Sequence, residues 1–447
     1  MKIFIPLIIS FSLVTNALFY NLGFLDIIIA AVSVVFTFSY FSRIKWRDRL
    51  SSLAVLLYCY LSMSFLPFSH LVPPIWNDID LERIALFGNR VYFVVISSLV
   101  ICGAFQQKYY NKRTQFFGTY TISDKQVNLF FAITFFTSLV SYALGVSVMG
   151  AESTELPFHM SGVLHDYRTV FAPLFFMIIV ENRVLNNKSV PRNWYVLFII
   201  WCLFESFLRI SKSSLVMGML PVGLFLVLYY KPSFRKLTIY LVPFTVAALF
   251  VYVVIGGMRG AEKATLAGFT EARKNATTGE LSEEWGGPVT ASFNRMFMSA
   301  MNYRADYHEF DDGKFFDFSK APIIFLWKGV ARYRTYFLHG KTESMFDSDG
   351  TTGIIDPLFW GGYGFCYIIL FITAGLAVII ENRVKGRLGL QISCALIFYN
   401  LIMTGNLSWL LSQNMFSYYV VRLIAIYIII RLNYNHKTKN LKLNSTR

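Results

Sequence analysis

The chain has 447 residues, of which 55% are hydrophobic and only 15% are charged. A soluble globular domain carries about 25% charged residues, so the chain lacks the polar shell that soluble domains of this total length need. The formal net charge of +15 would suggest nucleic-acid binding in a soluble protein. Here the positive residues are concentrated in short connections between apolar runs long enough to cross a bilayer. We therefore expect an all-α integral membrane protein and exclude nucleic acid as a partner.

Twelve spans fit the hydropathy, and in chain order they are 3–20, 22–42, 50–69, 86–106, 126–149, 164–182, 194–209, 213–230, 237–256, 356–380, 388–405 and 412–431. The first span resembles a signal peptide, but no small-residue cleavage site precedes the next one, so we read it as an uncleaved helix. Placing the N-terminus in the cytoplasm puts every Lys/Arg-rich short connection on the cytoplasmic side, as the positive-inside rule requires. An even number of spans returns the basic C-terminal tail to the cytoplasm.

The sequence contains no motif that binds a metal or a nucleotide cofactor. All five cysteines lie within or beside apolar runs, without the spacing of a disulfide framework or a Cys/His metal site. Asp347-Ser-Asp349 resembles a calcium loop only weakly, because the remaining ligands are missing. No Walker loop, dinucleotide fingerprint or nucleophile elbow is present. We expect neither a cofactor nor a metal.

One long connection divides the chain into three parts: spans one to nine in residues 1–256, an extracytoplasmic loop over 257–355, and spans ten to twelve with a basic tail in 356–447. Connections this long are usually functional or disordered. The loop contains a polar link followed by two predicted helices, from Pro288 to about Tyr307 and from Pro322 to Leu338 or His339. The second is amphipathic and suits the membrane interface.

Basic side chains are frequent on the extracytoplasmic side, where the positive-inside rule disfavours them. Arginine's planar fork suits bidentate binding of phosphate and carboxylate oxygens. An anionic, lipid-linked ligand would explain this set, which consists of Arg168, Arg209, Lys212, Arg259, Arg295, Arg304, Lys328, Arg332 and Arg334.

The clearest local pattern is Lys328, Arg332, Thr335 and His339, which share one face of a predicted helix. This stripe would place cations and a proton acceptor along the membrane surface. The alternative is the solvated polar face that any amphipathic helix has.

Two further groups lie at the extracytoplasmic ends of spans. His165, Asp166 and Arg168 begin the sixth span, where an unpaired arginine is costly and needs a partner or a ligand. The alternative is an Asp166–Arg168 ion pair that only anchors the span. Glu205 and Arg209 are separated by one helical turn, and a structural salt bridge between them is at least as plausible as a catalytic role for Glu205.

The chain resembles the Wzy-type O-antigen polymerases, the oligosaccharide repeat-unit polymerases of bacterial inner membranes. The architecture of about twelve spans with one dominant periplasmic loop before the last few is similar. Arg209-Ile-Ser-Lys212-Ser-Ser-Leu-Val resembles the family's Ser-Arg-(small)-Leu-Leu pattern, with Lys212 where the family often has arginine. Asp356-Pro-Leu-Phe-Trp-Gly-Gly-Tyr-Gly364, running into Leu370-Phe-Ile-Thr-Ala-Gly375-Leu, resembles its aromatic-Gly-x-x-Gly…Gly-Leu stretch.

The resemblance implies a metal-independent GT-C-type glycosyltransferase of lipopolysaccharide biosynthesis in the bacterial inner membrane, with its active site facing the periplasm. The growing glycan would pass from undecaprenyl pyrophosphate to the next undecaprenyl-pyrophosphate-linked repeat unit. We expect Arg168, Arg209 and Arg259 to bind the pyrophosphate, with further substrate contacts from Lys212, Arg295, Lys328, Arg332 and Arg334. His339 is the leading base by likeness to the related O-antigen ligases, and His165 and Asp166 are the alternatives. Membrane lipid surrounds the protein, and a chain-length regulator protein is left open as a partner.

Three other functions remain open from the sequence. An O-antigen ligase shares the architecture and differs in its acceptor, lipid A–core. A flippase or exporter of lipid-linked oligosaccharide would favour short loops and charges along many spans. A membrane O-acyltransferase would need an early histidine/arginine motif inside the spans, which we do not find.

Overall fold

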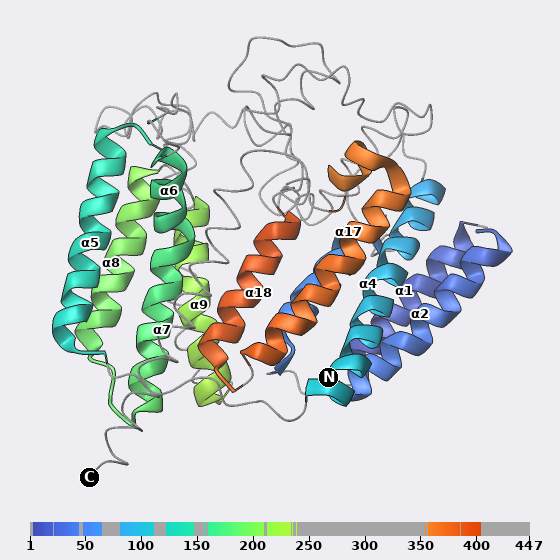
Figure 1. The fold of residues 1–447 in the computed structure, drawn as a ribbon, viewed down its shortest axis with the longest axis horizontal. Helices are drawn as coiled ribbons and strands as arrows, with labels where there is room; N and C mark the ends of the chain where they lie inside the picture. Colours follow the sequence, from blue (N-terminus) through green and yellow to red (C-terminus); the bar gives the residue numbers. More distant parts are fainter. Residues whose placement is uncertain are drawn as a thin grey trace. The chain divides into compact units, whose positions relative to one another are not determined.

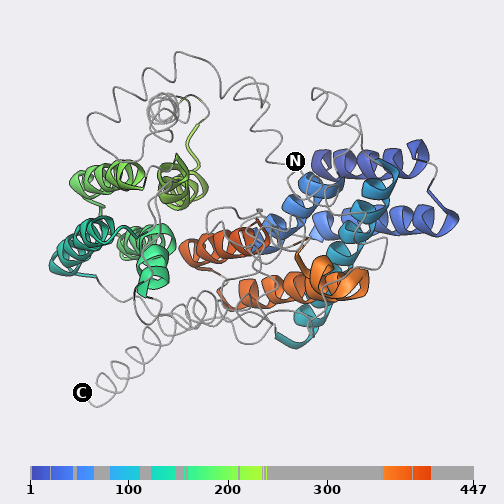
Figure 2. The same cartoon turned by 90° about the horizontal axis from the view of Figure 1, so that it is seen from above.

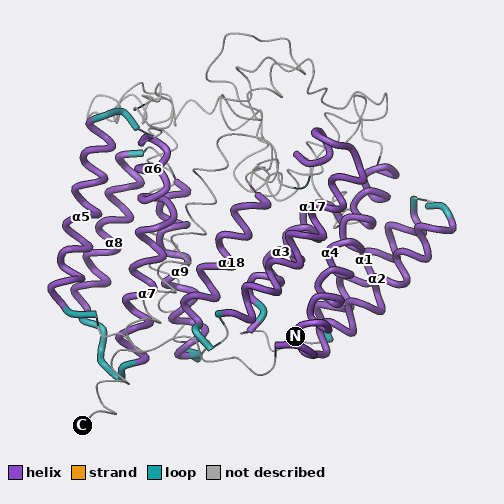
Figure 3. Tube along the Cα trace, viewed as in Figure 1, coloured by secondary structure: helices purple, strands orange, loops and turns teal. Residues whose placement is uncertain are grey.

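A computed structural model describes residues 3–20, 22–43, 48–64, 81–110, 122–146, 156, 160–209, 212–233, 235, 238, 354, 356–384 and 386–403. These ranges are mostly helical and contain no strand (Figure 3). Their helices, drawn in Figure 1, are α1 (Phe4–Phe19), α2 (Phe24–Arg43), α3 (Leu50–Cys59), η2 (Tyr60–Ser64), α4 (Leu81–Tyr110), α5 (Asp124–Ala143), α6 (Met160–Asp166), η5 (Tyr167–Phe171), α7 (Ala172–Leu185), α8 (Arg192–Leu208), α9 (Lys212–Tyr230), α17 (Asp356–Arg383) and α18 (Leu388–Met403).

Among these ranges, five helices are long and apolar enough to cross a membrane: Phe24–Arg43, Glu82–Phe105, Asp124–Ala143, Val163–Leu185 and Gly362–Arg383. The described residues therefore confirm the expected helical architecture and the presence of apolar helices long enough to span a membrane. The described part of each expected span is largely helical, although 50–69 and 164–182 are each divided into an α-helix and a π-helical turn, followed in the second case by a further α-helix. The expected spans 237–256 and 412–431 lie outside the described residues except for Thr238, so the number of spans and the orientation stay predictions.

The outer surfaces of the helices are apolar, and several of their inner surfaces are polar. On α1, the side chains of Phe4 and Phe11 are 65% and 62% exposed, whereas Ser12 and Asn16 are fully buried. A water-soluble protein shows the reverse arrangement. The pattern is typical of helices that face lipid and satisfy their polar groups against one another.

The chain divides into two compact units. Unit 1 contains α1 to α4, α17 and the later part of α18, and α4 packs against α1, α2, α3, η2 and α17 (Figure 2). Buried hydrogen bonds join these helices: the Asn16 amide donates to Asn89 Oδ1 at 3.2 Å and to the Ser64 carbonyl at 3.0 Å. Asp26 of α2 and Arg90 of α4 form a two-bond ion pair, at 2.8 and 3.1 Å. Such bonds supply specificity that apolar contacts with lipid-like surroundings do not.

Unit 2 contains α5 to α9 with the first residues of α18, and its α8 packs against both α5 and α9 (Figure 1). Trp201 Nε1 of α8 donates to Ser138 Oγ of α5 at 3.0 Å, which sets the spacing of these helices. The approach of α8 and α9 is close, since a Cβ atom added at Gly218 would lie 2.8 Å from Cys202 Sγ. In unit 2, α8 is therefore held against α5 on one side and packed closely against α9 on the other.

Candidate functional site

A group of three charged side chains is buried at this end of unit 2, and we call Arg168, Glu205 and Arg209 the Arg168 cluster. Arg168 lies in η5, between α6 and α7. Glu205 lies one turn before the end of α8, and Arg209 follows the last residue of that helix. Three ionised groups are costly to bury unless each is paired or hydrogen-bonded, so their bonds are informative.

The π-helical turn η5 has a local cause. Pro173, the second residue of α7, has no backbone N–H, and its ring crowds the carbonyl of Thr169 one turn earlier. The Thr169 hydroxyl donates to the His165 carbonyl at 2.9 Å, which satisfies one of the carbonyls in this interrupted stretch. Single π turns inside helices occur frequently at functional sites, because they redirect side chains. Here the turn carries Arg168.

Arg168 is held by α8 and by the turn after α5. Its Nε donates to Glu205 Oε1 at 2.8 Å, and its Nη1 donates to the Val146 carbonyl at 3.2 Å. The side chains of Arg168 and Glu205 are 0% and 3% exposed, so the pair is almost fully removed from solvent. The guanidinium orientation is thus fixed from two directions.

The turn that presents the Val146 carbonyl is a Schellman motif at the end of α5. Gly145 has a φ of +66°, in the left-handed region that favours glycine. The N–H groups of Val146 and Gly145 donate to the carbonyls of Ser141 and Tyr142, at 2.8 and 3.0 Å. The chain reverses there, which allows the next carbonyl to face Arg168.

Arg209 completes the cluster from the junction of α8 and α9. Its backbone N–H donates to the Glu205 carbonyl at 3.0 Å, which continues the ladder of α8. Its side chain reaches forward, and Nη1 donates to Ser214 Oγ of α9 at 2.9 Å. The charges of Glu205 and Arg168 are close enough to interact electrostatically with the Arg209 guanidinium.

The cluster keeps unused hydrogen-bonding capacity. Within the described residues, Arg168 Nη2, Arg209 Nε and Glu205 Oε2 are buried and have no hydrogen-bond partner. The cluster contains two guanidiniums and one carboxylate, and among the described side chains the carboxylate is paired with Arg168 alone. Buried N–H groups without partners are destabilising unless a ligand or water accepts from them. Chemically, the arrangement suits an anion with several oxygens, such as a phosphate group.

Two of the predicted site residues, Arg168 and Arg209, are therefore brought together. Among the described atoms Arg168 pairs with Glu205. The predicted alternative, an anchor pair with Asp166, stays a prediction because the Asp166 side chain lies outside the description. The carboxylate of Glu205 is used by Arg168 rather than by Arg209, contrary to the salt bridge weighed from their spacing. No sequence signal indicates this pair, since the partners lie 37 residues apart on different helices.

The other predicted residues are less fully described. His165 is half-buried in α6, three positions before Arg168. Asp166 ends α6 and Lys212 begins α9, and the side chains of both lie outside the description. The predicted loop residues also lie outside the described ranges, and they are Arg259, Arg295, Lys328, Arg332, Arg334 and His339. Their assigned roles stay predictions.

Two further observations complete the site. At the opposite end of unit 2, Arg183 pairs with Asp124 and lies over the Trp194 ring, 4.6 Å from its centroid, so that arginine is already engaged. In the described part of the chain, no three His, Cys, Asp or Glu side chains are grouped closely enough to hold a metal ion.

Comparison of the chain with protein-family models, with curated proteins and with solved structures found no match.

Proposed function

We propose that the chain polymerises lipid-linked oligosaccharide repeat units at the periplasmic face of a bacterial inner membrane. The observation that carries this proposal is the Arg168 cluster, in which two guanidiniums are buried beside one carboxylate, which pairs with Arg168, and both retain N–H groups without acceptors among the described residues. A lipid pyrophosphate that enters from the membrane has the charge and the oxygens to accept from them. The apolar helices around the cluster support access from the bilayer.

The proposed reaction is a glycosyl transfer. A hydroxyl oxygen on the end sugar of the incoming repeat unit forms a bond to the anomeric carbon of the growing glycan. The bond from that carbon to undecaprenyl pyrophosphate breaks, and the pyrophosphate oxygen takes the electron pair. The hydroxyl proton passes to a base, for which the candidates are His339, His165 and Asp166.

Arginines contribute most to this reaction at the leaving group, where negative charge develops. Arg168 and Arg209 would donate to the pyrophosphate oxygens through Nη2 and Nε, the atoms that have no partner in the described ranges. Glu205 would act as a positioning residue, because its carboxylate fixes the Arg168 guanidinium at 2.8 Å. Arg259, Lys212 and the loop residues Arg295, Lys328, Arg332 and Arg334 are proposed to bind the remaining phosphate and sugar groups.

The direct test uses purified full-length protein in lipid with the undecaprenyl-pyrophosphate-linked repeat unit from the same strain as the only substrate. A ladder of repeats on a gel, formed equally in excess EDTA, is the expected result. Transfer that requires lipid A–core would identify a ligase instead. Protein that is folded and inactive in both assays, yet moves the lipid-linked sugar across vesicles, would replace the proposal with transport.

A sharper test separates substrate binding from a purely structural ion pair. Replacing both partners, with Arg168→Gln and Glu205→Gln, removes the charges while it keeps side-chain size and hydrogen-bonding capacity. The control removes the charges of another ion pair between two helices, Asp26→Asn with Arg90→Gln in unit 1, where Asp26 is buried and Arg90 is about one-third exposed. We expect the first double variant to fold and to lose transfer, and the control to retain it. Equal activity of the two would exclude the Arg168 cluster from the site.

A further inference from the structure

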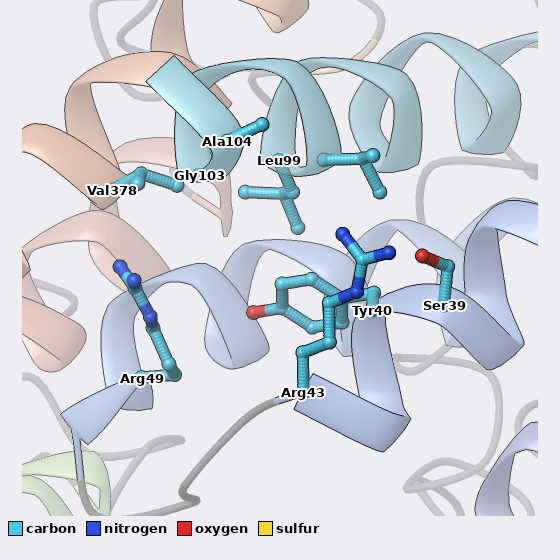
Figure 4. Close-up of a pocket in the computed structure, with 9 residues that line it drawn as sticks. Ser39, Tyr40, Arg43, Arg49, Leu99, Gly103, Ala104 and Val378 are labelled. Carbon is cyan, nitrogen blue, oxygen red and sulfur yellow. The ribbon is translucent and has the colours of Figure 1, made fainter. Parts of the chain in front are cut away.

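A second cationic site lies in unit 1, at a pocket formed where α2 ends and α3 begins, beside α4 (Figure 4). One side of the pocket is polar and consists of Ser39, Tyr40, Arg43 and Arg49. The other side is apolar and consists of Leu99, Val100, Gly103 and Ala104 of α4 with Val378 of α17. Two guanidiniums opposite an apolar wall suit a ligand that combines an anionic head with hydrocarbon.

The positive charge of the pocket is only partly compensated. Arg43 and Arg49 extend on either side of the Tyr40 ring, and Arg43 has no ion-pair partner among the residues that the structure describes (Figure 4). Arg49 Nη1 lies 3.6 Å from Glu381 Oε2, too far for a hydrogen bond, and it is buried without an acceptor in the described ranges. Glu381 accepts shorter bonds from the backbone N–H and hydroxyl of Ser52, at 2.7 and 2.9 Å. Both arginines therefore retain N–H groups for an anion.

The apolar wall opens toward the surface of α4. A Cβ atom added at Gly103 would meet nothing within 4 Å, so the space in front of this residue is empty of described protein atoms. Its neighbours Ile101 and Phe105 are exposed, at 41% and 62%. In a membrane-spanning helix, an exposed apolar surface of this kind faces the acyl chains.

We propose that this pocket binds the phosphate of an anionic phospholipid, with the phosphate between Arg43 and Arg49 and an acyl chain along α4 at Gly103. The basic connection that joins α2 to α3 is on the predicted cytoplasmic side, where anionic headgroups attract Lys and Arg. In the proposed complex, charge-assisted hydrogen bonds from Arg43 and Arg49 hold the phosphate, and the contact of the acyl chain with α4 adds to the affinity. The inference is independent of the proposed glycosyl transfer, because it concerns a different group of residues.

The test measures binding of a short-chain fluorescent phosphatidylglycerol to the full-length protein in neutral detergent. Phosphatidylcholine of the same chain length provides the zwitterionic comparison, and inorganic phosphate is the competitor. We expect phosphatidylglycerol to bind more tightly than phosphatidylcholine and to resist millimolar phosphate. Arg43→Gln should weaken its binding about tenfold or more, since a charged hydrogen bond is lost. Gly103→Leu should weaken it as well, because the new side chain fills the apolar part of the pocket.

The matched control is Arg192→Gln, which removes an exposed arginine at the start of α8 that is not among the residues lining the pocket. Binding to this variant should equal that of the parent. A loss as large as that of Arg43→Gln would show general surface attraction and overturn the proposal. Displacement by inorganic phosphate together with unchanged binding in Gly103→Leu would assign the pocket to a soluble phosphate and overturn the lipid. The Arg43 side chain is exposed, so we expect the Arg43→Gln variant to fold like the parent protein.

Discussion

Arg168 and Glu205 come from different helices of unit 2 and join Nε to Oε1 at 2.8 Å, with side chains 0% and 3% exposed. The second nitrogen and the second oxygen of this pair, Arg168 Nη2 and Glu205 Oε2, are buried without partners in the described ranges. A pair built only for stability would use these atoms, since the desolvation of both ions has already been incurred. The unpartnered Nη2 is the donor that the proposed anion site uses.

Removing only one partner of this pair should be much more destabilising than removing both. Arg168→Gln leaves the Glu205 carboxylate buried without its counter-ion, and we expect a loss of about 3–5 kcal/mol in the free energy of unfolding. Glu205→Gln leaves two neighbouring guanidiniums and should also destabilise. The double variant should recover much of the loss. The free energies of unfolding of the parent, the two single variants and the double variant, measured in detergent, give this coupling. A double-variant loss equal to the sum of the two single losses would contradict the pairing.

Arg209 is expected to contribute to transfer more than its hydrogen-bond partner does. Under the proposed function, Arg209→Gln removes a donor to the charge that develops on the leaving group, and we expect the transfer rate to fall by about 10²-fold or more. Arg209→Lys keeps the charge without the planar fork and should be intermediate. Ser214→Ala, the control, removes only the hydroxyl that orients Arg209 at 2.9 Å and should cost less than about tenfold. Initial rates of ladder formation give the order, and equal effects of Arg209→Gln and Ser214→Ala would leave Arg209 with no role beyond packing.

Two glycines of α4 provide a matched test of packing in unit 1. A Cβ atom added at Gly88 would overlap the Met63 backbone carbonyl, whereas one added at Gly103 meets nothing within 4 Å. Gly88→Ala should therefore lower the free energy of unfolding by about 1–3 kcal/mol through overpacking. Gly103→Ala should be neutral or slightly stabilising, because alanine is the better helix former. Similar unfolding midpoints for the two variants would contradict the close packing of η2 against α4 at Gly88.

The predicted orientation places the start of α8 in the cytoplasm and residues 257–355 in the periplasm. In intact cells, Ser299→Cys should react with a membrane-impermeant thiol reagent, whereas Arg192→Cys should react only after permeabilisation. Within the described structure, the native cysteines are buried or half-buried, so the parent protein gives a low background. The opposite labelling pattern would reverse the topology and move the Arg168 cluster to the cytoplasmic face.

The sequence predicts the helices well and their contacts poorly. The expected span at 126–149 begins two residues after α5 does, because hydropathy does not register the polar first turn. Ser123 and Gln126 form a capping box there, which starts the helix at Asp124. Sequence spacing predicts pairs only between residues about one turn apart on the same helix, so it pairs Glu205 with Arg209. The partner of Glu205 is Arg168, and that contact depends on how α8 packs beside η5.

The polar face of α1 has a consequence for how the protein is made. Asn16 finds its partners, Ser64 and Asn89, 48 and 73 residues later in the chain. When α1 first enters the membrane during synthesis, neither partner has been inserted, and a lone asparagine amide in hydrocarbon is unfavourable. We therefore expect α1 to be bound less firmly in the bilayer until η2 and α4 supply these partners, so that unit 1 reaches its final packing only after its fourth α-helix has been synthesised.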